Sequence, residues 1–148
     1  MKKIFAIFAA IAVSASGVFA ANRLSSSVAS MEGPEGYSFN KALSDRLGME
    51  VYAPADASGA ISFGAQEAAG DVTPSAIATV LANALMKDGV HSTMTAADGA
   101  PVHMVASADG LTVLAIAGDK KASRYAVVIF RDKAAAQASA LLKSLKMK

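Results

Sequence analysis

The stretch MTAADGAPVHMVASADGLTVLAI, residues 94–116, contains two Asp-Gly pairs eleven residues apart, each between short apolar segments. Asp-Gly accepts positive φ at both central positions of a tight turn, so it favours a two-residue hairpin loop whose twist matches its strands. The two pairs therefore predict three consecutive antiparallel strands within residues 91–118. The apolar segment SRYAVVIF, residues 123–130, predicts a fourth strand beside them.

Three helices and a further hairpin are predicted around these four strands. A helix over residues 38–47 is expected to begin at Ser38 and to end at Gly48. A second helix, residues 74–88, begins with an N-cap threonine and a proline at its first helical position. Its apolar residues at core spacing are Ile77, Val80, Leu81, Ala84 and Leu85. Asp132 is expected to cap a last helix, residues 132–146. The segments EVYAP and AISFG, on either side of the turn-rich ADASG, are typical of a short hairpin.

The element order α-β-β-α-β-β-β-β-α predicts one α+β domain over residues 38–148, with a largely antiparallel sheet of about four to six strands. In residues 21–37, Leu24, Val28 and Met31 have the spacing of a short helix, whereas the serines and the Gly33-Pro34 break equally favour a flexible arm. Both faces of the sheet carry apolar residues, which requires cover from helices, a second subunit or an apolar ligand. We expect cover from the chain itself, because Ala115, Ala117 and Ala126 allow helices to approach closely.

The first twenty residues have the features of a secretory signal peptide. Lys2 and Lys3 precede the apolar run IFAIFAAIAV, and Val18 and Ala20 occupy the −3 and −1 positions of a cleavage site before Ala21. The apolar run is shorter than the about 20 residues that span a bilayer. The sequence thus predicts a periplasmic or secreted protein, and the absence of cysteine excludes disulfides, thiol chemistry and a lipid anchor on cysteine.

The charges are segregated along the chain. Residues 21–119 hold four basic and eleven acidic residues, whereas residues 120–148 hold eight basic residues and one acid, Asp132. The basic end could bind an anionic envelope surface through Lys143, Lys146 and Lys148, or it could dock on the acidic remainder of the chain. No dense basic cluster with interleaved aromatic residues is present, so a nucleic-acid partner is not predicted.

A histidine and a methionine form the first candidate site. A two-residue turn at Asp98-Gly99 places Met94 directly opposite His103 and leaves His91 on the other face. Imidazole with thioether suits copper, but one pair is incomplete, so no metal site is assigned. The second turn places His103 opposite Ile116. The ligand-binding residues predicted from the sequence are Met94, His103, Arg124 and Tyr125.

The motifs of common enzymes are missing. There is no Gly-x-Ser-x-Gly elbow, no dinucleotide or phosphate-binding glycine motif, and the candidate bases are only His91 and His103. No cofactor is predicted. These features favour a small exported binding or accessory protein of the bacterial envelope without catalytic activity, whose partner is an apolar ligand, a protein, or a second copy through a sheet face. The alternatives are a periplasmic copper-binding protein and a small hydrolase that uses His103 or His91.

Overall fold

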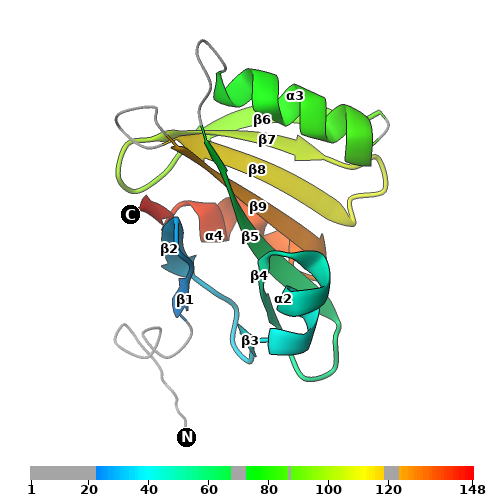
Figure 1. The fold of residues 1–148 in the computed structure, drawn as a ribbon. Coiled ribbons are helices and arrows are strands. Elements are labelled where there is room, and N and C mark those ends of the chain that lie inside the picture. The colour runs from blue at the N-terminus through cyan, green and yellow to red at the C-terminus, as the bar shows by residue number, and fades with distance from the viewer. Residues whose placement is uncertain (1–22, 68–72, 87, 119–123) are drawn as a thin grey trace, which may run out of the picture.

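The computed structural model describes residues 23–67, 73–86, 88–118 and 124–148, and it shows helices packed on antiparallel sheets (Figure 1). The strands of the large sheet are β3 (Ser38–Phe39), β4 (Glu50–Ala53), β5 (Gly59–Glu67), β6 (Val90–Thr95), β7 (Pro101–Ala106), β8 (Thr112–Gly118) and β9 (Arg124–Asp132). The small sheet contains β1 (Arg23–Ser25), β2 (Ala29–Glu32) and β10 (Lys146–Met147). The helices are α2 (Lys41–Leu47), α3 (Pro74–Leu85), the 3-10 helix η2 (Ala135–Gln137) and α4 (Ala138–Leu142).

The predicted α+β class and antiparallel pairing are confirmed. The large sheet has seven strands in the order β3-β4-β5-β9-β8-β7-β6, and the small sheet has three in the order β1-β2-β10. The prediction of about four to six strands was too low, and the predicted element order lacks β1, β2, β3 and β10. These four strands have two to four residues each, too short to give a clear alternating pattern in the sequence.

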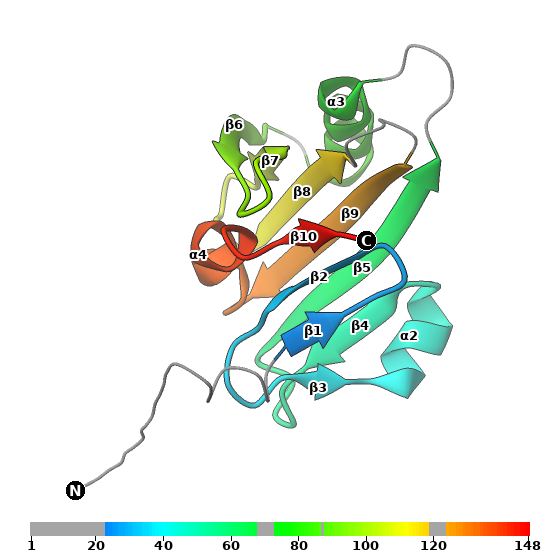
Figure 2. The same cartoon turned by 90° about the vertical axis from the view of Figure 1, so that its left-hand side faces the viewer.

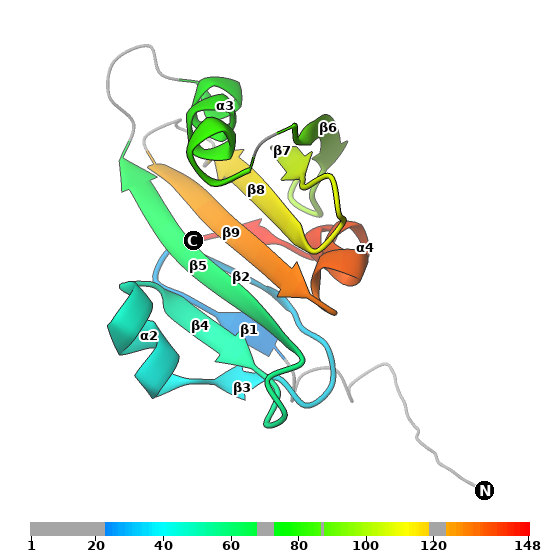
Figure 3. The same cartoon turned by 90° about the vertical axis from the view of Figure 1, so that its right-hand side faces the viewer.

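The chain covers both faces of the large sheet. Figure 3 shows α2 and α3 on one face, which we call the helix face, and Figure 2 shows α4 and the small sheet on the other, which we call the sheet face. Ala115, Ala117 and Ala126 are at most 1% exposed and belong to the core beneath the sheet face. The expected cover by the chain itself is therefore confirmed. On the sheet face, the elements that pack over these alanines are the small sheet and α4, not a helix alone.

The segment before residue 38 is built into this core. Leu24, Val28 and Met31 are at most 1% exposed, and they lie on or beside β1 and β2. The Tyr52 hydroxyl donates a hydrogen bond to the Ser25 carbonyl oxygen at 2.6 Å and ties β1 to β4. Residues 23–32 thus form paired strands instead of the helix or flexible arm expected from the sequence. The predicted signal peptide, residues 1–20, lies outside the described residues.

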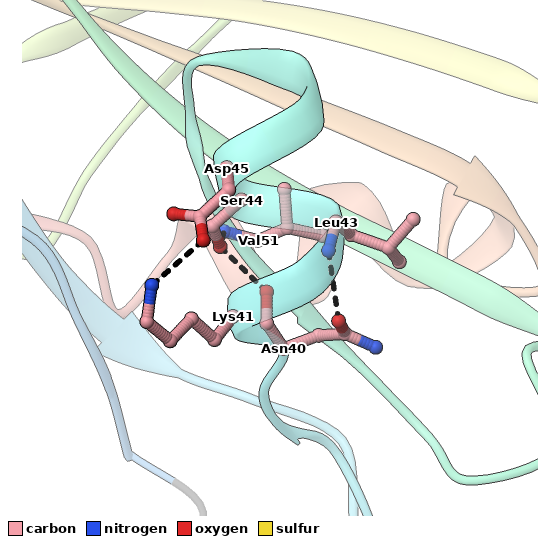
Figure 4. A network of polar contacts seen from close by, with 6 residues as sticks. All are labelled: Asn40, Lys41, Leu43, Ser44, Asp45 and Val51. Atoms are coloured by element: carbon pink, nitrogen blue, oxygen red, sulfur yellow. Dashed lines mark hydrogen bonds and ion pairs between the residues drawn. The ribbon is translucent and has the colours of Figure 1, made fainter.

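The predicted helices form with shifted ends. In α2 the N-cap is Asn40, whose Oδ1 accepts a hydrogen bond from the Leu43 amide at 2.9 Å, whereas Ser38 belongs to β3. The Ser44 hydroxyl donates to the Asn40 carbonyl and accepts from the Val51 amide, so it joins α2 to β4 (Figure 4). Gly48 ends the helix as predicted, with φ of +69°.

The ends of the other two helices differ in how well they match the sequence. Thr73 caps α3 as predicted, because its hydroxyl accepts a hydrogen bond from the Ala76 amide at 3.1 Å. Asp132 does not cap a long helix. It ends β9 with φ of +57°, and the predicted helix over residues 132–146 is replaced by η2, the five-residue α4 and β10.

The two Asp-Gly turns differ in their register. In the first, the Ala96 amide donates to the Ala100 carbonyl at 2.9 Å, so the loop contains three residues, 97–99, and only Gly99 has positive φ. This loop places Met94 opposite Val102 and Thr93 opposite His103, which shifts the predicted pairing by one residue. The predicted register of the second hairpin is confirmed, with His103 opposite Ile116.

Candidate binding surface

The one-residue shift separates the two members of the predicted Met94 and His103 pair. Because side chains alternate between the faces of a sheet, His103 now lies on the helix face and Met94 on the sheet face. Met94 packs partly against the core there. The prediction that these two side chains are opposite each other on one face was therefore wrong, since it assumed a two-residue loop.

The same shift brings the two histidines onto one face. His91 is exposed and His103 is half-buried, and Thr93, opposite His103, lies two residues from His91 along β6. Diagonal neighbours of this kind have Cα atoms about 7–8 Å apart. The prediction that His91 lies on the other face was thus also wrong. Among the described residues, no group of three or more His, Asp or Glu side chains is placed to hold a metal ion.

Arg124 and Tyr125 are neighbours at the start of β9, and their side chains lie on opposite faces of the sheet. Tyr125 is 3% exposed and packs in the core beneath the helix face. It stands opposite Gly118, where an added Cβ would come within 2.9 Å of the tyrosine ring. The Arg124 guanidinium donates to the Lys148 carbonyl oxygen at 2.5 Å. The four predicted ligand-binding residues do not form one cluster, and a binding role for any of them stays a prediction.

The three C-terminal lysines have different environments. The Lys148 ammonium donates hydrogen bonds to the Ser25 hydroxyl at 2.6 Å and to the Ser26 carbonyl oxygen at 2.5 Å. Lys143 and Lys146 are exposed. The Lys148 ammonium therefore links the C-terminus to β1 and to the residue that follows it. Binding of an anionic envelope surface stays a prediction that rests mainly on Lys143 and Lys146.

The sequence pattern did not show which side of α3 faces the sheet. Ile77, Ala78 and Ala82 are buried, whereas Val80 is 67% exposed and Leu85 is 55% exposed. The helix thus turns two alanines toward the sheet and two large apolar side chains toward solvent. Ile77 is buried as its spacing predicts, whereas the prediction that Val80, Ala84 and Leu85 face the core was wrong.

The outer surface of α3 is uncharged, and it exposes Val80 and Leu85 beside the polar residues Ser75, Thr79 and Asn83. No Lys, Arg, Asp or Glu occurs between Pro74 and Leu85. Beside this surface is a groove of about 320 Å³, which is lined by Gln66, Ala76, Ile77, Val80 and Leu81. Surface helices normally place charged or polar residues on their outer side. We therefore take Val80, Leu85 and this groove as the candidate binding surface, and call it the α3 surface.

Two further depressions, of about 420 and 410 Å³, flank the turn between β4 and β5, and both are lined by a mixture of polar and apolar groups. Tyr37 lines the second, together with Asp56 and Lys133. Burial, followed by the negative charges of Asp56 and Asp132, raises the pKa of the Tyr37 phenol above its ordinary value. The depression thus favours the neutral tyrosine.

The raised pKa of Tyr37 makes stability fall at alkaline pH. The unfolded phenol ionises at a pKa of about 10, below the pKa of the folded one, so the stability linked to this proton is complete below about pH 10 and is lost as pH rises through the folded pKa. We expect urea midpoints to fall more steeply from pH 9.5 to 11 in the natural protein than in Tyr37→Phe. Parallel curves for the two proteins would contradict this account.

The comparisons do not place the chain in a family. No protein-family model matches the sequence, and no curated protein matches it either. Across the residues that the structure describes, no helix is both long and apolar enough to cross a membrane. The candidate function therefore rests on the residues and the geometry described above.

Proposed function

We propose that the protein is a small, exported, non-catalytic binding or accessory protein of the bacterial envelope, and that its α3 surface contacts an apolar group of a partner protein. Export is inferred from residues 1–20, and the lack of enzyme motifs favours binding over catalysis. The observation that carries the binding role is the exposure of Val80 and Leu85 on a helix without charged residues.

The energetics and dimensions of the α3 surface suit a protein partner. Removing a side chain such as Val or Leu from water stabilises a complex by about 1.5–3 kcal/mol when burial is complete. The groove beside Val80 measures about 320 Å³, near the lower limit of about 300 Å³ for small-molecule pockets. One apolar side chain inserted in the groove would contact Ile77, Val80 and Leu81. Leu85 lies about 140° around the helix axis from Val80 and would form a separate contact at the end of α3.

The proposal predicts a position-specific contact in the cell. A photo-crosslinking amino acid at Val80 should give an adduct of discrete mass with an envelope protein, because this side chain projects from the outer side of α3. The same amino acid at Ser139, an exposed residue of α4, is the matched control and should give none. Mass spectrometry of the envelope fraction identifies both the adduct and the mature N-terminus, which should be Ala21.

Three results would overturn parts of this proposal separately. No adduct from Val80 in intact cells, or equal adducts from Val80 and Ser139, would remove the α3 surface as the contact. An adduct with the mass of two copies of this chain would make the partner the protein itself. A chain recovered from the cytoplasm with residues 1–20 intact would contradict export without affecting the α3 surface.

A further inference from the structure

The structure leaves one long edge of the large sheet unpaired among the described residues. One outer strand is β3, which has two residues, and the other is β6, which has six, five of them exposed. In Figure 3, β6 lies at the border of the sheet and α3 crosses the neighbouring part of the helix face. Exposed edge strands present N–H and C=O groups that can pair with another chain.

The sequence of β6 lacks the usual protection against such pairing. Natural edge strands carry lysine or another charge, proline or a bulge, or are very short. Strand β6, VHSTMT, contains no proline and no Lys, Arg, Asp or Glu, and it pairs with β7 over six consecutive residues without a bulge. Val90, at its start, is 65% exposed. This edge is thus open to a partner strand.

The hydrogen-bonding pattern identifies the groups that face outward. In an antiparallel pair, alternate residues direct both backbone groups toward the neighbouring strand. Because the Ala96 amide donates to the Ala100 carbonyl, residues 90, 92 and 94 direct their groups toward β7. His91, Thr93 and Thr95 therefore direct their N–H and C=O groups away from the sheet.

We infer that β6 pairs with β6 of a second copy of this chain, antiparallel and about a twofold axis at Thr93. A twofold axis perpendicular to the sheet places the helix faces of the two copies on the same side of the joined sheet. Hydrogen-bonded pairs then form only between residues whose N–H and C=O groups point away from β7, so these residues must pair with one another. An axis at Thr93 pairs Thr93 with Thr93 of the second copy and His91 with Thr95, which gives about six backbone hydrogen bonds. An axis at Ser92 would give only about four.

The charge pattern favours a second copy as the occupant of the edge. Twofold pairing places each residue of β6 near residues of the same strand, and like charges directly opposite each other would destabilise such a pair. Strand β6 carries no carboxylate, lysine or arginine, and the whole chain has a formal charge of only +2, so repulsion between copies is weak. The threonine pair at the axis is a favourable cross-strand pair.

The test is sedimentation equilibrium of the protein as isolated from its host, over about a hundredfold range of concentration. We expect a reversible monomer and dimer equilibrium, whose dissociation constant rises at least about tenfold in Thr93→Lys, because two lysines then meet at the axis. Ser139→Lys, which adds the same charge on α4, should dimerise like the natural protein. Val80→Asp should also dimerise, because the inferred interface does not use the α3 surface.

Amide hydrogen exchange tests the register. It is measured on the natural protein, so its result does not depend on whether Thr93→Lys folds. In the natural protein, exchange at His91, Thr93 and Thr95 should slow as concentration rises, whereas exchange at Ser92 and Met94 should be slow at every concentration. A monomer at all concentrations would overturn the inference. So would a dimer that survives Thr93→Lys but is lost in Val80→Asp, which would place the contact on α3.

Discussion

Replacing Phe63 with alanine is expected to lower the free energy of unfolding by about 3–5 kcal/mol, the range for large aromatic truncations in a core. Phe63 is 1% exposed and lies on β5, in the centre of the core between the large and small sheets. Its ring also meets Tyr52 edge to face, with ring centroids 6.0 Å apart. The substitution leaves a cavity and removes this aromatic contact, and urea unfolding measures the loss.

Phe39 provides a matched control for this prediction. It contacts the same Tyr52 ring, edge to face at 5.7 Å, but it lies on the outer strand β3 and is 51% exposed. Phe39→Ala should therefore cost about 1 kcal/mol, mainly from the aromatic contact. If both substitutions cost the same, the difference in burial does not determine their effect, and the packing described for the small sheet against β5 is incorrect.

The hairpins could be predicted from the sequence, but their register could not. Asp98-Gly99 and Asp109-Gly110 are each in a turn, as expected. The first loop nevertheless takes three residues, and Asp98 shows why local chemistry did not decide it. Its carboxylate accepts hydrogen bonds from the Ala100 amide within the turn and from the Met147 amide of β10, 49 residues away. The one-residue shift moved His91 to the face of His103 and left Met94 on the opposite face.

The orientation of α3 was unpredictable for a related reason. Its polar residues, Ser75, Thr79 and Asn83, form one exposed stripe, which places the core on the opposite side of the helix. The stripe does not decide which border of that side is buried, the one with Val80 or the one with Ala78 and Ala82. The buried residues are set by the surface that receives them, where Leu114, Ile116 and Val127 fill the space and leave room for alanines. The candidate binding surface is consequently visible only after α3 is placed on the sheet.

The N-terminal segment shows the same limit most clearly, because its strands have partners far away in the sequence. The amide of Lys148 donates to the Val28 carbonyl oxygen at 2.9 Å, and Lys146 pairs with Ser30. Nothing within residues 21–37 reveals these contacts. Three apolar residues at helical spacing, Leu24, Val28 and Met31, instead suggested a short helix, although all three are buried between sheets.

Leu24→Ala should therefore destabilise the protein by about 2–5 kcal/mol, the range for a buried leucine. Leu24 is 1% exposed and pairs with Met31 between β1 and β2. The control is Leu47→Ala at the end of α2, where the side chain is 50% exposed and the expected cost is about 1 kcal/mol or less. A flexible arm predicts no loss for Leu24→Ala, so equal urea midpoints for this variant and the natural protein would remove β1 from the folded core.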